Sequence, residues 1–211
     1  MKTLNLLIAF ILISFSSFAQ NEKSEVVIQK GIDMMETAKS MNDYGDAGVY
    51  FEKIGIAQPN EWLPKYYAAY VNLIYGLKGT QDQKLKDEFY DKALRLVAKA
   101  DSIAPNNSEI YTLNAYITFM KMAVAPQARG MSLMPKSTAL IAKAIALDPE
   151  NPRAYLIKGQ NLFYTPEAFG GGKEKAKVVL LQASEKFKTF KTAKLMPTWG
   201  KESCSSMLQG M

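Results

Sequence analysis

The sequence contains no histidine and only one cysteine, Cys204. Without histidine, a Ser–His–Asp triad, a histidine general base and most zinc or copper sites are excluded. A single cysteine cannot form an intramolecular disulfide, and as a nucleophile it would lack its usual histidine partner. We therefore expect a protein that is not an enzyme and that holds no metal and no cofactor. We expect Cys204 to be buried against the last helices.

Long apolar runs are also scarce, and the one that is present lies at the N-terminus. Residues 4–15 are almost entirely apolar, follow a short start that contains Lys2, and precede the small residues of Ser17-Phe18-Ala19. This order is typical of a secretory signal peptide, and the run is too short to span a hydrocarbon core of about 30 Å. We predict a signal peptide over residues 1–19 and a soluble protein, periplasmic or secreted, without a transmembrane segment.

The junction that follows the signal is also informative. No cysteine stands after the small residues, which argues against a lipid anchor. The compact signal and its Ala-Gln junction resemble those of exported proteins from Bacteroidota-type bacteria. Cleavage after Ala19 would remove one lysine and no acid, so the net charge would fall from +6 to +5.

Charge is unevenly distributed along the chain. The segment from Lys173 to Lys201 alone contains eight lysines and two glutamates. Such a stretch either forms a solvated polar face or attracts an acidic protein or anionic lipid, and for an exported protein we expect no nucleic-acid partner. The four acids between Asp82 and Asp91 lack the alternation of an EF-hand loop. That pattern favours acids at a helix N-terminus over a Ca²⁺ site.

One spacing of residues recurs four times. A small residue is followed four positions later by a large apolar residue and three positions after that by alanine, or by Ile54 in the first copy, so that all three share one face of a helix. In the first three copies a proline follows five positions later and ends the helix. A helix with one such face cannot bury it alone, so the repetition predicts a stack of helices. The copies are Ala47-Phe51-Ile54, Ala93-Val97-Ala100, Ser137-Ile141-Ala144 and Ala176-Leu180-Ala183, with Pro59, Pro105 and Pro149.

The segments after the prolines carry a second pattern, a bulky residue followed four positions later by a small one. Examples are Tyr111-x3-Ala115 and Tyr155-x3-Gly159. Together the two patterns resemble the tetratricopeptide repeat (TPR) family, whose A helices carry the bulky–small pair and whose B helices end at the proline. The resemblance covers residues 28–190. It implies an all-α fold in which antiparallel helical hairpins stack as a short right-handed α-solenoid.

The resemblance also suggests a division of the chain. We expect a repeat domain of about four hairpins over residues 20–196. A C-terminal cap or tail would follow over residues 197–211, because terminal repeats need a polar cover. We expect Trp199 to cover the open end of the stack.

Successive prolines are 46 and 44 residues apart, whereas the TPR period is 34. The surplus lies between the A and B helices, in Gly79–Gln83, Val124–Pro135 and Thr165–Gly172. These stretches are rich in turn-forming residues. They predict either A helices that are a turn longer than usual or long intra-repeat loops on one edge of the solenoid.

The insertions supply one set of candidate site residues. In Thr165–Gly172, Phe169 precedes three glycines, which either let the chain reverse at φ > 0 or cradle an anion on free backbone N–H groups. In Val124–Pro135, flexible methionines suit either an adaptable contact surface or the filling of core gaps. The loop candidates are Phe169, Gly170, Gly171, Gly172, Met131 and Met134.

A second set follows from the resemblance, because A helices line the concave groove of TPR arrays. The corresponding positions are rich in aromatic residues and include arginine, the types that are enriched at hot spots of interfaces. The alternative is that these aromatics are buried in the core. The charged peptide clamp of some TPR proteins is not reproduced. The groove candidates are Tyr66, Tyr70, Glu109, Thr112, Tyr116, Arg153, Gln160 and Phe163.

Two functions are compatible with these features. The first is a non-catalytic, exported TPR-like scaffold that mediates protein–protein interaction with an unidentified protein or peptide of the cell envelope. The second is a carrier of a small amphipathic ligand in an aromatic pocket of the helical stack. Separate aromatics on an open groove would favour the scaffold, and a closed pocket of about 300 Å³ or more would favour the carrier.

Overall fold

The computed structural model describes residues 23–211, and this part of the chain is helical with no strand. None of its helices is long and apolar enough to cross a membrane. The predicted signal peptide, residues 1–19, lies outside the described residues. A helix over residues 23–36 comes first. It is followed by α2 (Met41–Ala57), α3 (Leu63–Ile74), the π-helical turn η1 (Tyr75–Gly79), α4 (Gln83–Ile103), α5 (Ser108–Val124), α6 (Pro126–Leu147), α7 (Pro152–Tyr164), the 3₁₀ turn η2 (Glu167–Phe169), α8 (Lys173–Thr189) and α9 (Lys201–Gln209).

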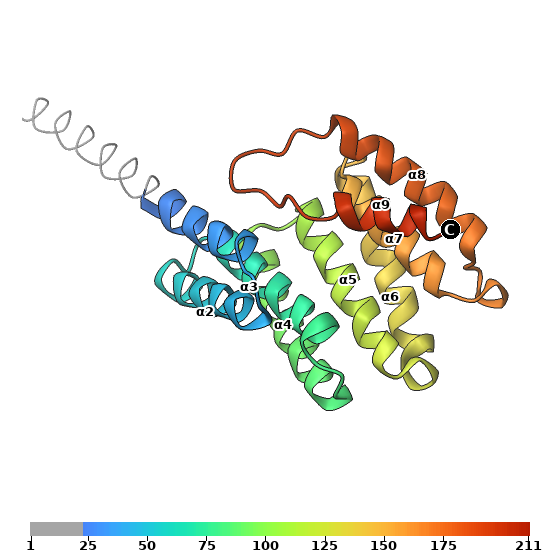
Figure 1. The fold of residues 1–211 in the computed structure, drawn as a ribbon, viewed down its shortest axis with the longest axis horizontal. Helices are drawn as coiled ribbons and strands as arrows, with labels where there is room; N and C mark the ends of the chain where they lie inside the picture. The colour runs from blue at the N-terminus through green and yellow to red at the C-terminus, as the bar shows by residue number, and fades with distance from the viewer. Residues whose placement is uncertain (1–22) are drawn as a thin grey trace, which may run out of the picture.

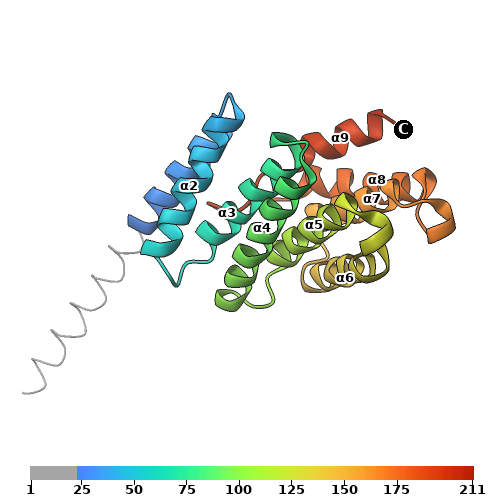
Figure 2. The same ribbon diagram turned by 90° about the horizontal axis from the view of Figure 1, so that it is seen from below.

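Consecutive helices pack against each other as hairpins, and the hairpins follow one another along the molecule in chain order (Figure 1). Seen from below, the helix over residues 23–36 and α2 stand at one end, with α7 and α8 toward the other (Figure 2). The predicted A helices α3, α5 and α7 also contact one another in succession. The predicted all-α stack of hairpins is therefore confirmed.

The repeated spacing marks the buried faces of α2, α4, α6 and α8. Every residue of the four copies is buried, and the alanines among them are 0% exposed. Three of these helices end two residues before a proline, at Ala57, Ile103 and Leu147. In each case the next backbone N–H still donates to the carbonyl four residues back, for example from Ala104 to Ala100. The spacing thus predicted the packed face of all four helices and the end of the three that precede a proline.

Of the two alternatives stated for Val124–Pro135, the long loop is wrong, because all of these residues except Ala125 are helical. Only Ala125 separates α5 from α6, which begins at Pro126 and carries Pro135 in its interior. Proline suits the first turn of a helix, where its missing N–H would have no partner. The added turns are also held in place from outside, since Arg129 donates to both carboxylate oxygens of Asp87 on α4, at 2.5 and 2.7 Å. The surplus residues therefore lengthen the hairpin.

The other two insertions differ from each other. In the first, α3 continues through the π-helical turn as far as Gly79, and only three residues remain before α4. The extra residues there mainly lengthen the helix. Thr165–Gly172 is a loop with a single 3₁₀ turn, as predicted.

After α8 the chain turns back over the stack. Residues 190–200 form an irregular connection that arcs away from α8 and returns to α9 (Figure 1), which packs on α8. Cys204 of α9 is 1% exposed, and its Sγ lies 3.4 Å from the Leu180 carbonyl oxygen. The predicted burial of this thiol is confirmed, and burial raises its pKa.

Candidate functional site

The groove candidates lie on α3, α5 and α7, and the contacts between these helices bring them together. Most are nevertheless buried. Tyr66, Thr112 and Arg153 are at most 1% exposed, and only Tyr70 and Phe163 are partly exposed. The remaining members of the set are Glu109, Tyr116 and Gln160, at 5%, 9% and 8% exposure.

The C-terminal connection covers this face. The indole ring of Trp199 stacks on Tyr70 at 5.2 Å between ring centroids and lies tilted over Tyr116 at 6.2 Å. Its Nε1–H donates to the Tyr66 hydroxyl oxygen at 3.0 Å. The Tyr67 hydroxyl donates to the Leu195 carbonyl oxygen at 2.8 Å. The expectation that Trp199 covers the open end of the stack is therefore wrong. Trp199 lies across the A helices instead.

The charged members of the set form one buried ion pair. Arg153 donates from Nε and Nη2 to the two carboxylate oxygens of Glu109, at 2.8 and 2.6 Å. The guanidinium also lies 5.1 Å from the ring centroid of Phe190 and 5.9 Å from that of Trp199. Burial lowers the pKa of Arg153, but the hydrogen bond and charge of Glu109 outweigh it and the net shift is upward. The two side chains thus satisfy each other by hydrogen bonds within the buried face.

Burial also governs the tyrosines of this face. It raises the pKa of Tyr66 and Tyr70 well above the ordinary value and raises that of Tyr116 as well. These phenols are neutral hydrogen-bonding groups at pH 7. They are not candidates for proton transfer, since a general base needs a pKa close to the working pH.

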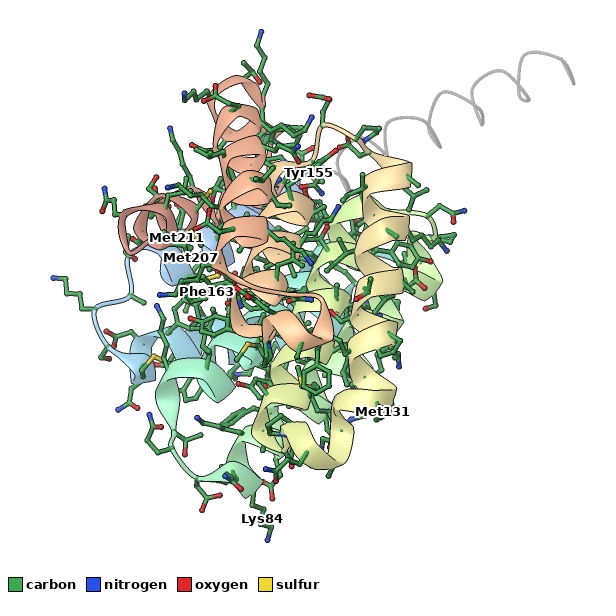
Figure 3. All side chains as sticks on the ribbon, turned by 90° about the vertical axis from the view of Figure 1, so that its right-hand side faces the viewer. Lys84, Met131, Tyr155, Phe163, Met207 and Met211 are labelled. Carbon is green, nitrogen blue, oxygen red and sulfur yellow. The ribbon has the colours of Figure 1, made fainter. Side chains whose placement is uncertain are left out.

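The loop candidates gather around a hollow of about 350 Å³ between α6, α7 and the loop before α8. Met134, Phe169, Gly170 and Gly171 all line it. Met131 and Gly172 do not line it. Met131 is 91% exposed and lies toward the N-terminal end of α6 (Figure 3). Sequence analysis missed the rest of the lining, which consists of Thr138, Ile141, Ala142, Ile145, Lys158, Asn161, Leu162 and Thr165.

The glycines shape the wall of this hollow. Gly170 and Gly172 have φ of +87° and +111°, values that favour glycine. A Cβ on Gly171 would lie 2.0 Å from the Thr165 carbonyl oxygen. The N–H groups of all three glycines donate to carbonyls of Pro166, Glu167 or Leu162. The interpretation as a tight turn is confirmed, and these N–H groups are already used within the protein.

One signal could have identified part of the missed lining. Asn161 lies in the interior of a helix, where asparagine is unfavourable because its side chain competes with the backbone for hydrogen bonds. It stands four residues after Ile157 and seven after Ala154, both of which are buried. A polar residue at such a position requires a partner, and here it has one on α6.

Three of the four acids between Asp82 and Asp91 are occupied by other contacts. Asp82 accepts from the Leu85 N–H at 2.9 Å and caps the helix, Asp87 pairs with Arg129, and Asp91 pairs with Lys121. Within residues 23–211, no group of three or more Cys, Asp or Glu side chains is placed to hold a metal ion.

The basic stretch runs along α8 and the connection that follows. Three of its lysines pair with acids, Lys186 with Glu150, Lys188 with Glu185 and Lys194 with Glu25. Most of its lysines are exposed, among them those at positions 173, 175, 177 and 191. This is the solvated polar face that the sequence allowed for.

Solved structures similar to this one include a haemophore and a TPR protein. No protein-family model and no curated protein matches the sequence. The haemophore HusA from Porphyromonas gingivalis superposes with a TM-score of 0.76 at 26% identity, over 87% of this chain and 90% of HusA. A thermophilic TPR protein from Thermus thermophilus superposes with a TM-score of 0.65 at 17% identity, over 89% of this chain and 80% of that protein. The second similarity shows the fold alone, and it confirms the TPR-like architecture.

Proposed function

We propose that this protein is an exported, non-catalytic carrier of a small, flat amphipathic ligand, and that haem is the first ligand to test. The observation that carries the proposal is the similarity to a haemophore, a haem-binding protein, at 26% identity over nearly the whole of both chains. Export rests on the signal-peptide pattern of residues 1–19.

The hollow beside α6 and α7 is the site that fits such a ligand. Its volume of about 350 Å³ lies within the range of small-molecule pockets. Its lining is largely apolar, and the exposed Lys158 brings a cation that suits the carboxylate of an amphipathic molecule. Since the chain has no histidine, imidazole ligation of a haem iron is excluded. Met134 brings a thioether sulfur, which serves as an axial ligand in some haem proteins.

Phe169 is the side chain that tests this site most cleanly. It is 81% exposed at the rim, so its removal leaves the core intact. We expect the mature chain to bind haem in an absorbance titration, and Phe169→Ala to weaken binding at least about fivefold through lost apolar contact. The matched control is Ile56→Ala on α2, since Ile56 is also 82% exposed but does not line the hollow.

Two results would count against the proposal. If haem gives no saturable spectral change with the wild-type chain, the similarity to a haemophore does not extend to its ligand. If haem binds equally well to wild type and to both variants, the protein is a carrier but the hollow is not its site.

The scaffold function remains a second candidate, and one observation favours it. The A-helix face, where TPR arrays take peptides, does hold a polypeptide segment here, namely residues 190–200 of the same chain. A partner that binds the groove candidates would have to displace Trp199. A synthetic peptide of residues 190–211 would compete with such a partner in a pull-down, and an unchanged yield of partner would argue against the groove.

A further inference from the structure

A second hollow lies between α2, α3 and α4, apart from the one beside α6 and α7. Its volume is about 410 Å³. Both α2 and α4 pack on α3, so α3 forms the floor of the hollow and the other two helices form its walls. The side chains that give it its chemistry are Asp46, Val49 and Glu52 on α2, Asn72 on α3, and Phe89 and Lys92 on α4.

Fixed contacts between the elements frame this hollow. The Lys92 ammonium pairs with the Glu52 carboxylate at 2.6 Å and joins α4 to α2. The ring of Tyr75, which also lines the hollow, lies 5.1 Å from that of Phe89 between centroids, and the Tyr75 hydroxyl donates to the Met41 carbonyl oxygen at 2.6 Å. The walls are therefore held in place by an ion pair, a ring contact and a hydrogen bond.

The floor carries a buried amide with one unpaired end. Asn72 is 5% exposed and lines the hollow. Its Nδ2 donates to the Ala68 carbonyl oxygen at 2.7 Å. A carbonyl oxygen can only accept, so this contact fixes which end of the amide is the NH₂ group. The other end, Oδ1, accepts no hydrogen bond from any group in the described part of the chain.

This oxygen is accessible from the hollow. Three buried side-chain atoms of the described residues are both unpaired and fully enclosed, and Asn72 Oδ1 is not one of them. It therefore keeps some accessible surface. Because nearly all of the residue is buried and it forms part of the lining, that surface faces the hollow. An acceptor in this position is satisfied only by a donor from solvent or from a ligand, since leaving it unpaired is costly.

The walls of the hollow add negative charge. Asp46 is exposed and forms no ion pair with another described residue, and Glu52 brings a second carboxylate. The ammonium of Lys92 is already paired with Glu52. The lining thus has one carboxylate more than it has cations, in a chain whose net charge is +6. An unpaired acceptor beside surplus negative charge suits a cation that carries several N–H donors.

We infer that this hollow is a second binding site and that it takes a small primary amine with an aromatic or other apolar stem. The ammonium donates to Asn72 Oδ1 on the floor, and the Asp46 carboxylate on the wall attracts its charge. The stem packs against Val49 and Phe89. A metal ion fits less well, because no three Cys, Asp or Glu side chains of the described residues converge. The inference does not depend on the carrier function proposed for the other hollow.

Tryptamine and tryptophol test this site. They share the indole ring and the two-carbon arm, and differ only in ending in an ammonium or a hydroxyl group. We expect the wild-type mature chain to bind tryptamine at least about fivefold more tightly, because hydrogen bonds from a charged donor are the stronger ones. An NMR titration of the ¹⁵N-labelled chain gives both affinities and locates the site. The amides that shift should be those of residues 42–52, 71–75 and 89–92.

Three variants assign the preference to named side chains. Asp46→Asn keeps the size of an exposed side chain and removes its charge, so the preference for tryptamine should fall to about twofold or less. The matched control is Glu174→Gln on α8, which removes one exposed carboxylate elsewhere and should keep the wild-type preference. Asn72→Leu removes the acceptor and should weaken tryptamine binding at least about fivefold.

Several results would overturn the inference. These are equal affinities for the two probes, no saturable binding of either, or amide shifts confined to the hollow beside α6 and α7. An unchanged preference in Asp46→Asn, or an equal loss in Glu174→Gln, would do the same. Should Asn72→Leu not fold, Asp46→Asn still decides, because Asp46 is exposed and its substitution leaves the core intact. The haem titration decides the carrier function separately.

Discussion

Arg153 is among the largest side chains that the described part of the molecule buries completely. It occupies a position that faces the groove in TPR arrays, yet its charge is used within the fold. Glu109 accepts two of its hydrogen bonds, and Phe190 and Trp199 lie close to the guanidinium. Removing one partner of such a pair leaves an uncompensated buried charge, which costs more than the pair itself contributes.

We therefore expect Glu109→Gln to lower the free energy of unfolding by about 3–5 kcal/mol, as measured by urea denaturation. The substitution keeps the size of the side chain but removes the counter-charge of Arg153. The matched control is Glu185→Gln, which breaks an exposed pair with Lys188 and should change stability by no more than about 1 kcal/mol. Similar small effects of both substitutions would mean that the pair is solvated in solution.

Whether the burial of a residue could be predicted from the sequence depended on how far along the chain its contacts lie. The burial of Ala100 and Ala144 could be read from spacing, since it depends on one helix face and its neighbour. The burial of Tyr66 could not, because Trp199, which bonds to it, lies 133 residues away in the chain. The hydrogen bond that Asn161 donates to Ser137 was equally out of reach, since it depends on a serine on another helix.

At the scale of elements, two insertions that are both rich in turn-forming residues adopt different structures. Val124–Pro135 is mostly helical, whereas Thr165–Gly172 is a loop. Proline and glycine in Val124–Pro135 indicated a loop, but Pro126 begins α6 and Gly130 lies within it. The bidentate contact between Arg129 and Asp87 joins α6 to α4, a contact that no local pattern reveals. The loop over Thr165–Gly172 was predicted correctly from its glycines. Two of them, Gly170 and Gly172, have positive φ angles that an α-helix does not permit.

The two glycine sites predict opposite effects of the same substitution. In Gly171→Ala the new Cβ would lie 2.0 Å from a backbone oxygen, so the turn must open and stability should fall by more than about 1 kcal/mol. In Gly130→Ala the Cβ meets nothing within 4 Å on a helix, so stability should rise by about 0.4–1 kcal/mol. Thermal unfolding of both variants checks the pair. A destabilised Gly130→Ala would indicate that α6 begins later than Pro126.

At the scale of the whole molecule, the helical stack could be predicted from the sequence. The closure of its A-helix face by the C-terminal connection could not. The four repeats specify neighbouring contacts only, which is sufficient for a solenoid. The closure depends on residues 190–200, which carry none of the repeated pattern. This closure is why the aromatic side chains of the A helices behave as core, and it concentrates buried tyrosines at the centre of the fold.

Those tyrosines determine how the protein responds to alkaline pH. Burial raises the pKa of Tyr90 to about 12 and raises the pKa of Tyr66, Tyr70 and Tyr116, whereas an unfolded tyrosine titrates near 10. Above pH 10 the unfolded chain therefore binds fewer protons than the folded one, and stability falls as pH rises. The stabilising contribution is complete below pH 10 and is lost as the pH rises through the folded pKa. No histidine adds a transition near pH 6.5.

We expect the urea midpoint to fall steadily between pH 9.5 and 11, with one part of the absorbance of ionised tyrosine at 295 nm, that of the buried tyrosines, appearing only together with unfolding. Tyr90→Phe serves as the control, because it removes one group with a raised pKa and should make the dependence on pH shallower. Each unit of pKa difference corresponds to about 1.4 kcal/mol, so the change is large enough to measure. If the whole tyrosine absorbance, including that of the buried side chains, instead appears near pH 10 while the helices stay intact, the A-helix face is open to solvent, and Trp199 does not close it as described.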